Sequence, residues 1–280
     1  QTSATALAAE SDAVERGAGI AVYSNALLII MVPHSIITVS LATAMLPDLS
    51  RLAAGSNLAT LRDRVMSALR AALAVIIPIA GLILALSGPV SRLLFGYGAA
   101  SGDVDLVAIT VAAFVPGLAG YTVTYLVQRA FYAQEDTRTP VLVQLVVSAV
   151  QVGLSIALVT RLDPVYVSAG LAGSWSVAVL LGAALSLTLL SRRVGRVGGW
   201  RFAGYLAVVA LAALPGSLLV LREVVVDAET TVTSSIGALV TIVVGSGVAA
   251  VSYLVLAWLF RVTPVRDAAS WAAARVRRGA

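Results

Sequence analysis

The 280-residue chain is too apolar and too sparsely charged for an ordinary soluble domain. Hydrophobic residues make up 59% of it, charged residues 12%, and its mean hydropathy is +0.96. Soluble domains average roughly 45–50% apolar and about 25% charged residues. The net charge of +5 is the excess of 19 basic residues, all arginine, over 14 acidic residues, and the arginines lie mainly between apolar runs. This composition predicts an integral membrane protein and gives no indication of nucleic-acid binding.

Seven apolar runs are long enough to cross a bilayer, which takes about 20 residues in a helix. We therefore expect an all-α integral membrane protein with about seven transmembrane helices. The predicted spans are Gly19–Leu46, Val65–Ser87, Val104–Ala133, Pro140–Arg161, Val165–Leu190, Phe202–Leu221 and Ile236–Phe260.

Prolines mark several of the predicted helix boundaries. Pro33 lies inside the first span and predicts a kink, because proline has no N–H to donate to the helix. Pro47 is expected to close that span. Thr139-Pro140 and Asp163-Pro164 each read as an N-cap followed by proline at the first helical position.

The arginines are distributed unequally between the two ends of the predicted spans. Fifteen fall on one side and four on the other. By the positive-inside rule, the C-terminus is cytoplasmic and the N-terminus is outside. An outside N-terminus without a signal sequence suggests further helices upstream. We divide the chain into a polar extracytoplasmic lead-in (1–18), a seven-helix transmembrane lobe (19–262) and a basic amphipathic cytoplasmic tail (263–280).

The residue inventory argues against an enzyme. The chain has no cysteine and a single histidine, His34, and it contains no Walker loop, HExxH motif or anchored Ser-His-Asp set. We expect no catalytic residue, no metal site and no cofactor. A coupling ion or the membrane potential remains open as the source of energy.

Polar side chains inside the spans are the candidates for a substrate pathway, because they are costly in lipid unless they meet a partner or a wet cavity. Helix–helix hydrogen bonding is the alternative role, and for Arg129 snorkelling to lipid phosphates is the favoured explanation. Gln144 and Gln151 are seven residues apart and so share a helix face. The candidates are Asn25, His34, Ser35, Gln128, Arg129, Gln144 and Gln151.

A charged segment, RAFYAQEDTRTP, joins the third and fourth spans. Its structural interpretation is a tight cytoplasmic turn with a helix start. Its functional interpretation is a gate at the inner mouth, in which Glu135, Asp136 and Arg138 make and break ion pairs.

Two stretches resemble the MurJ (MviN) lipid II flippases. The first runs from Pro33 to Gly98. The second contains Phe131, Tyr132 and Ala133 and then Asp136, Thr137, Thr139 and Pro140, at the spacing of the family element. Together they make residues 20–150 similar to the family. Beyond them, only hydropathy and helix count match.

The resemblance implies a fourteen-helix, two-lobe exporter of which this chain is the second lobe. It also implies that the last two helices form a lateral groove for the lipid tail. Many family members carry a cavity arginine at the position of Leu28, and often an acidic or amide residue at the position of Met31. This chain departs from the family at both positions, so the cationic part of the cavity must come mostly from elsewhere.

We interpret the chain as the C-terminal lobe of a lipid II flippase in the bacterial cytoplasmic (inner) membrane, working by alternating access from the inner to the outer leaflet. Expected partners are lipid II or a related undecaprenyl-pyrophosphate glycan, membrane lipids, the N-terminal seven-helix lobe and cell-wall regulatory proteins. The alternatives are a flippase for another polyprenyl-linked glycan and a non-transporting membrane scaffold for cell-wall synthesis.

Overall fold

The computed structural model describes residues 19–97, 102–226, 235–260 and 262, and this part of the chain is helical with no strand. The predicted lead-in and basic tail lie outside the described residues. The elements are α2 (Ile20–Pro33), the π-helix η1 (His34–Val39), α3 (Ser40–Ala54), α4 (Leu58–Ala85), α5 (Ser87–Phe95), α6 (Val104–Ala133), α7 (Arg138–Val159), the 3₁₀ turn η3 (Pro164–Tyr166), α8 (Val167–Val194), α9 (Trp200–Val226) and α10 (Ser235–Leu259).

Seven stretches of these helices are long and apolar enough to cross a membrane, which confirms the predicted span count. The third predicted span coincides with α6. Pro164 begins a 3₁₀ turn instead of the next α-helix, and Asp163 makes no side-chain cap hydrogen bond there. Helix α5 is a short separate helix that the sequence analysis did not predict.

Pro33 is followed by a change in helix type. Residues His34–Val39 form a π-helix between α2 and α3, and the three segments together make one long span. Proline removes a helical hydrogen bond and its ring collides with the preceding turn, and such interruptions favour the wider π-turn. Where the sequence predicts a kink, the structure thus has a π-helical segment directly after Pro33.

Two predicted boundaries at the next turn are wrong. Pro47 does not close the first span, since α3 continues to Ala54 with Pro47 inside it. The following helix begins at Leu58, seven residues before the predicted start, because the Asn57 side chain accepts a hydrogen bond from the Thr60 N–H (3.2 Å). The predicted loop is thus a tight turn between two helices whose charged ends extend past the apolar spans.

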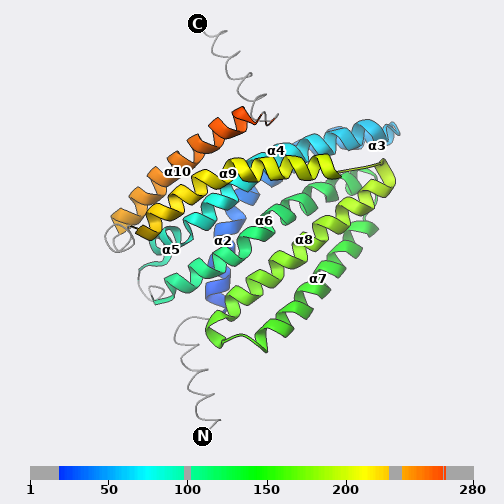
Figure 1. The fold of residues 1–280 in the computed structure, drawn as a ribbon. Helices are drawn as coiled ribbons and strands as arrows, with labels where there is room; N and C mark the ends of the chain where they lie inside the picture. Colours follow the sequence, from blue (N-terminus) through cyan, green and yellow to red (C-terminus); the bar gives the residue numbers. More distant parts are fainter. Residues whose placement is uncertain (1–18, 98–101, 227–234, 261, 263–280) are drawn as a thin grey trace.

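Helix α6 is the centre of the bundle. In Figure 1 it lies between the α7–α8 pair and a group formed by α4, α9 and α10, with α2 crossing behind. At the crossing with α8, the Gly117 N–H donates to the Ser176 hydroxyl oxygen (3.2 Å), and that hydroxyl donates to the Ala113 carbonyl (2.7 Å). Small residues allow this close backbone approach between membrane helices.

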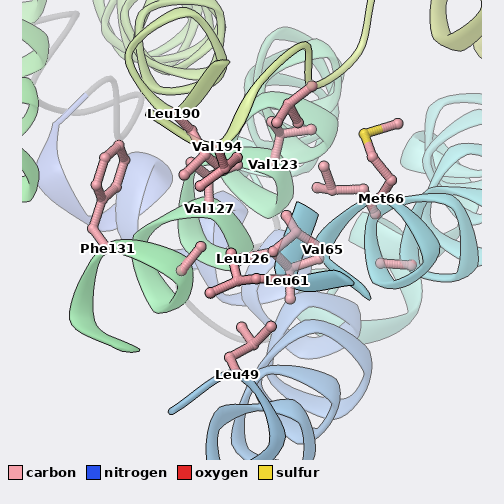
Figure 2. Packing of buried hydrophobic residues seen from close by; sticks show 14 of the residues in the cluster. Leu49, Leu61, Val65, Met66, Val123, Leu126, Val127, Phe131, Leu190 and Val194 are labelled. Carbon is pink, nitrogen blue, oxygen red and sulfur yellow. The ribbon is translucent and has the colours of Figure 1, made fainter. Parts of the chain in front are cut away.

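The largest buried cluster lies toward the end of the bundle where α3 meets α4. Figure 2 shows Leu49 of α3, Leu61 of α4, Leu126 and Phe131 of α6 and Leu190 of α8 packed together. All five are essentially inaccessible. Helices from both halves of the described chain therefore share one core.

Helices α7 and α10 present their apolar side chains outward. Leu142 and Leu145 on α7 are each 61% exposed, and Val243 on α10 is 63% exposed. A soluble protein does not leave such continuous apolar surfaces open, so these faces fit lipid or further membrane helices.

We expect Gly117→Ala to destabilise the α6–α8 contact. An added Cβ would lie 2.4 Å from the Trp175 ring and 2.8 Å from the backbone of Ser176, too close to be relieved by one side chain. Overpacking of this kind costs about 1–3 kcal/mol. Thermal unfolding of the purified protein measures the loss. Gly153→Ala is the matched control, because nothing lies within 4 Å of its added Cβ; equal effects of the two changes would contradict the expectation.

Candidate functional site

The single histidine lies in an aromatic cluster between the first span and α6. His34 is only 3% exposed, and its ring centroid is 4.4 Å from that of Tyr121 and 5.2 Å from that of Tyr125. Its Nδ1 has no hydrogen-bond partner. A buried polar atom of this kind costs free energy unless a water, ligand or further chain meets it.

The π-helix positions this histidine against α6. One turn after His34, the Thr38 and Thr122 hydroxyls lie 3.2 Å apart and are both buried. Ser35 is exposed, and its hydroxyl donates to the Met31 carbonyl of its own helix (2.8 Å). Asn25 is partly buried on α2. It does not line the pocket formed by the predicted glutamines.

Three predicted pathway residues do come together. Gln128 of α6 and Gln144 and Gln151 of α7 line one pocket of about 180 Å³. The remaining lining residues are Tyr121, Thr124, Tyr125, Val147, Trp175 and Val179. The pocket is polar but uncharged, so it can hydrogen-bond a ligand or a neighbouring helix without attracting an ion of either sign.

The sequence analysis missed the aromatic and hydroxyl part of this pocket. Tyr121 and Tyr125 are four residues apart, and Gln128 follows three residues later. That spacing places all three on one helix face and would have identified the stripe. Thr124 carries a buried hydroxyl oxygen without a partner, which no local pattern reveals.

Arg129 folds back onto aromatic rings. Its guanidinium carbon lies 4.6 Å from the Tyr125 ring centroid and 5.8 Å from that of Tyr132, and it donates a hydrogen bond to the Tyr125 hydroxyl. Arginine over an aromatic face gains electrostatic and stacking energy. Arg129 thereby extends the stripe that begins at His34 and Tyr121.

Asp136 links the N-terminal end of α7 to the C-terminal end of α8. Its Oδ1 accepts hydrogen bonds from the backbone N–H groups of Arg138 and Thr139, each at 3.0 Å, which caps α7. Its Oδ2 lies 2.6 Å from the Arg193 guanidinium at the end of α8. Arg193 also donates to the Thr139 hydroxyl (3.1 Å) and lies over the Phe131 ring.

These contacts set the charge state of Asp136. Hydrogen bonds from Thr139, above all that of its side chain, hold the pKa of the carboxyl below its usual range, and Arg193 acts in the same direction against the opposing effect of burial. The other two predicted gate residues are exposed. Glu135 has a positive φ of 58° at the turn, and Arg138 contributes its backbone N–H to the cap.

A long apolar groove lies on the opposite side of α6, between α4, α9 and α10. Its volume is about 950 Å³. The lining is almost entirely carbon: Ala71, Ala74, Val75, Pro78, Ile79, Leu82, Ala213, Ser217, Ala249, Ala250, Tyr253, Leu254, Val255 and Trp258. The groove involves the last two spans, as the resemblance implies, and α4 forms its third wall.

Among the described residues, no group of three His, Cys, Asp or Glu side chains is placed to hold a metal ion. The candidate site has three parts: an uncharged pocket of amide and aromatic side chains, the turn capped by Asp136, and the apolar groove. None of these parts supplies a nucleophile aligned with a base.

We expect Asp136→Asn to lower the stability of the α7–α8 hairpin by about 1 kcal/mol, because the amide keeps the cap acceptor but loses the charge. A lowered folded-state pKa stabilises the protein above the unfolded value of about 3.9, and this contribution disappears as pH falls through the folded value. The difference between wild type and variant should therefore be roughly constant above about pH 5, begin to fall at about pH 4 and vanish only below the lowered folded-state pKa.

Chemical unfolding across this pH range measures that difference. Asp63→Asn is the control, because its pair with Arg62 is at the surface and 67% of the Asp63 side chain is exposed. Such pairs contribute about 0–1 kcal/mol. A difference that persisted at low pH would contradict the assigned role of Asp136.

Comparison with known proteins identifies the family of this chain. The profile of the family described as "Lipid II flippase MurJ" matches residues 5–260. The probable lipid II flippase MurJ of Rhizobium meliloti (strain 1021) is 29% identical over 163 residues, which cover 56% of this chain and 30% of that protein. That of Rhizobium tropici is 28% identical over 194 residues, covering 69% and 36%.

A solved structure shares the fold. The chain matches "Lipid II flippase MurJ, inward closed conformation" with a TM-score of 0.66 and 22% identity, over 86% of this chain and 47% of the other. The aligned regions thus span about a third of the curated relatives and half of the solved structure. The family profile covers most of the 280 residues, and the chain therefore belongs to the lipid II flippase MurJ family.

Proposed function

We propose that this chain is the C-terminal lobe of a transporter that moves lipid II from the inner to the outer leaflet of the bacterial cytoplasmic membrane. The match of the family profile over residues 5–260 carries the proposal. The structure adds the two environments that such an amphiphile needs. One is the polar pocket beside α6, and the other is the apolar groove formed by α4, α9 and α10.

The two environments suit opposite ends of the substrate. The pocket glutamines offer amide donors and acceptors to the uncharged sugar and peptide groups. The groove offers hydrocarbon to the undecaprenyl chain, whose transfer out of water is favourable. Alternating access would then expose the polar path first inward and then outward as one lobe rocks against the other.

The pyrophosphate needs positive charge that the amide pocket lacks. Leu28, at the position of the family arginine, is 62% exposed and points away from the described bundle. We propose that the N-terminal lobe faces this side and supplies most of the cationic surface. The proposed pathway residues remain Asn25, His34, Ser35, Gln128, Arg129, Gln144 and Gln151, and the gate remains Glu135, Asp136 and Arg138.

The arginine distribution supports the orientation in which the C-terminus is cytoplasmic. Arg51, Arg64 and Arg196 are exposed near helix ends on that side. Neither an enzymatic step nor a cofactor is part of the proposal. The source of energy is a coupling ion or the membrane potential.

We expect the double variant Gln144→Leu with Gln151→Leu to slow flipping roughly 10- to 30-fold, since two hydrogen bonds at about 1 kcal/mol each are lost. The measurement is the appearance of labelled lipid II at the outer leaflet, read with an impermeant reagent, in vesicles containing the purified protein. Val146→Ala, on an exposed part of α7, is the control. Unchanged flipping in the double variant would remove the pocket from the pathway.

The second candidate function, a scaffold that recruits cell-wall proteins, depends on the basic tail. Removing residues 264–280 should leave lipid II flipping within about twofold of the wild-type rate if the seven spans and their partner lobe do the work. A scaffold would instead lose its bound partners in a pull-down from membranes. Repeating the flipping assay with another polyprenyl-linked glycan distinguishes the remaining alternative.

A further inference from the structure

The apolar groove has almost no hydrogen-bonding capacity left for a ligand. The Tyr253 hydroxyl donates to the Ala74 carbonyl, and the Ser217 hydroxyl donates to the Ala213 carbonyl (3.1 Å). The Tyr205 hydroxyl, beside the groove, donates to the Arg70 carbonyl (2.8 Å). All three hydroxyl donors are thus used within the protein, and the indole N–H of Trp258 is the remaining donor of the lining.

A cationic side chain lies at one end of this groove. Arg70 precedes Ala74 by one turn of α4, so the two share a helix face, and Ala74 and Ala71 both line the groove. Its guanidinium carbon is 6.0 Å from the centroid of the Tyr205 ring. Tyr205 in turn packs against the cluster that contains Ala74 and Tyr253. Figure 1 shows α4, α9 and α10 running alongside one another.

The guanidinium lacks a counter-ion in the described part of the chain. Arg70 is partly buried, its Nε is inaccessible and without a hydrogen-bond partner, and no described carboxylate lies within ion-pair distance. Arg129 also has an inaccessible Nε without a partner, but its guanidinium donates to the Tyr125 hydroxyl, whereas Arg196 is exposed. A partly buried cation with an unused donor is costly unless an anion meets it.

We propose that Arg70 binds the phosphate of a polyprenyl phosphate lipid whose chain occupies the groove. The inference rests on the proposed function and assigns to this lobe a phosphate contact separate from the amide pocket. Guanidinium pairs with phosphate through two parallel hydrogen bonds, which its rigid fork favours. The groove lining includes Trp258, and the Tyr205 ring lies beside the Arg70 guanidinium; aromatic side chains of this kind are enriched at membrane interfaces.

Because the groove hydroxyls already donate to backbone carbonyls, the groove distinguishes between two classes of lipid. A glycerophospholipid carries two ester carbonyls just below its phosphate, and these acceptors would enter a carbon-lined groove with one indole N–H to share. A polyprenyl phosphate continues directly from phosphate into hydrocarbon, so it leaves no acceptor unpaired. The groove therefore fits the polyprenyl lipid better than the phospholipids around it.

The test is lipid binding to the purified whole protein, measured by native mass spectrometry with four probes added separately: undecaprenyl phosphate, undecaprenol, phosphatidylglycerol and inorganic pyrophosphate. Arg70→Gln should weaken undecaprenyl phosphate binding about tenfold, the equivalent of about 1.4 kcal/mol, and leave undecaprenol binding unchanged. Arg70→Lys should retain part of the affinity, because it keeps the charge without the fork. Arg196→Gln is the matched control and should change neither.

Equal loss of undecaprenol and undecaprenyl phosphate in Arg70→Gln would show a structural role and overturn the proposal. Phosphatidylglycerol binding as tightly as undecaprenyl phosphate would assign the groove to glycerolipids. Displacement of undecaprenyl phosphate by inorganic pyrophosphate at equal concentration would show an anion site that does not need the polyprenyl chain, and this would also overturn the proposal. Lipid II flipping is measured separately. If the wild-type protein binds undecaprenyl phosphate but does not flip lipid II, the proposed function is overturned and this binding site still stands.

Discussion

The close crossing of α6 and α8 is the constraint on which the rest of the bundle depends. Gly117 and Gly120 bring the two backbones so near that an added Cβ at Gly120 would lie 3.0 Å from Leu180 backbone atoms. Between membrane helices there is little hydrophobic driving force, so such packing, together with the Ser176 hydrogen bonds, holds the pair. Helices α2, α4 and α7 are then placed relative to this pair, and with them both candidate binding surfaces.

The amide and aromatic pocket lies on one side of α6 and the apolar groove on the other, so the described bundle has two separate chemical environments. Tyr121, Tyr125 and Gln128 face α7 and the π-helix, whereas the groove beyond α4 is nearly all carbon. A molecule that is half polar and half hydrocarbon can therefore contact this bundle with each part in a matching environment. This division is what the flippase interpretation requires of a membrane-embedded protein.

The helices were predictable from the sequence because a bilayer imposes a minimum apolar length, and the third span was found to the residue. The predicted helix ends were wrong where capping or helix continuation carried a helix beyond its apolar run. The Asn57 cap and the continuation through Pro47 both extend helices into charged sequence that a hydropathy criterion excludes. The grouping of Gln144 and Gln151 was predictable because both lie on one helix. The pairing of Asp136 with Arg193, or of His34 with Tyr121, joins residues far apart in sequence and needs the tertiary fold.

The π-helix has a consequence for how this span compares with related ones. Val22, Ala26, Ile30, His34, Thr38 and Ala42 are all buried at four-residue intervals, whereas an α-helix at 3.6 residues per turn drifts by about 40° at each such step. The wider turn between His34 and Val39 absorbs part of that drift and returns the stripe to α6. A π-turn amounts to one residue inserted into an α-helix. A related span with an uninterrupted α-helix would therefore align with a single-residue gap inside a membrane segment, where gaps are otherwise unexpected.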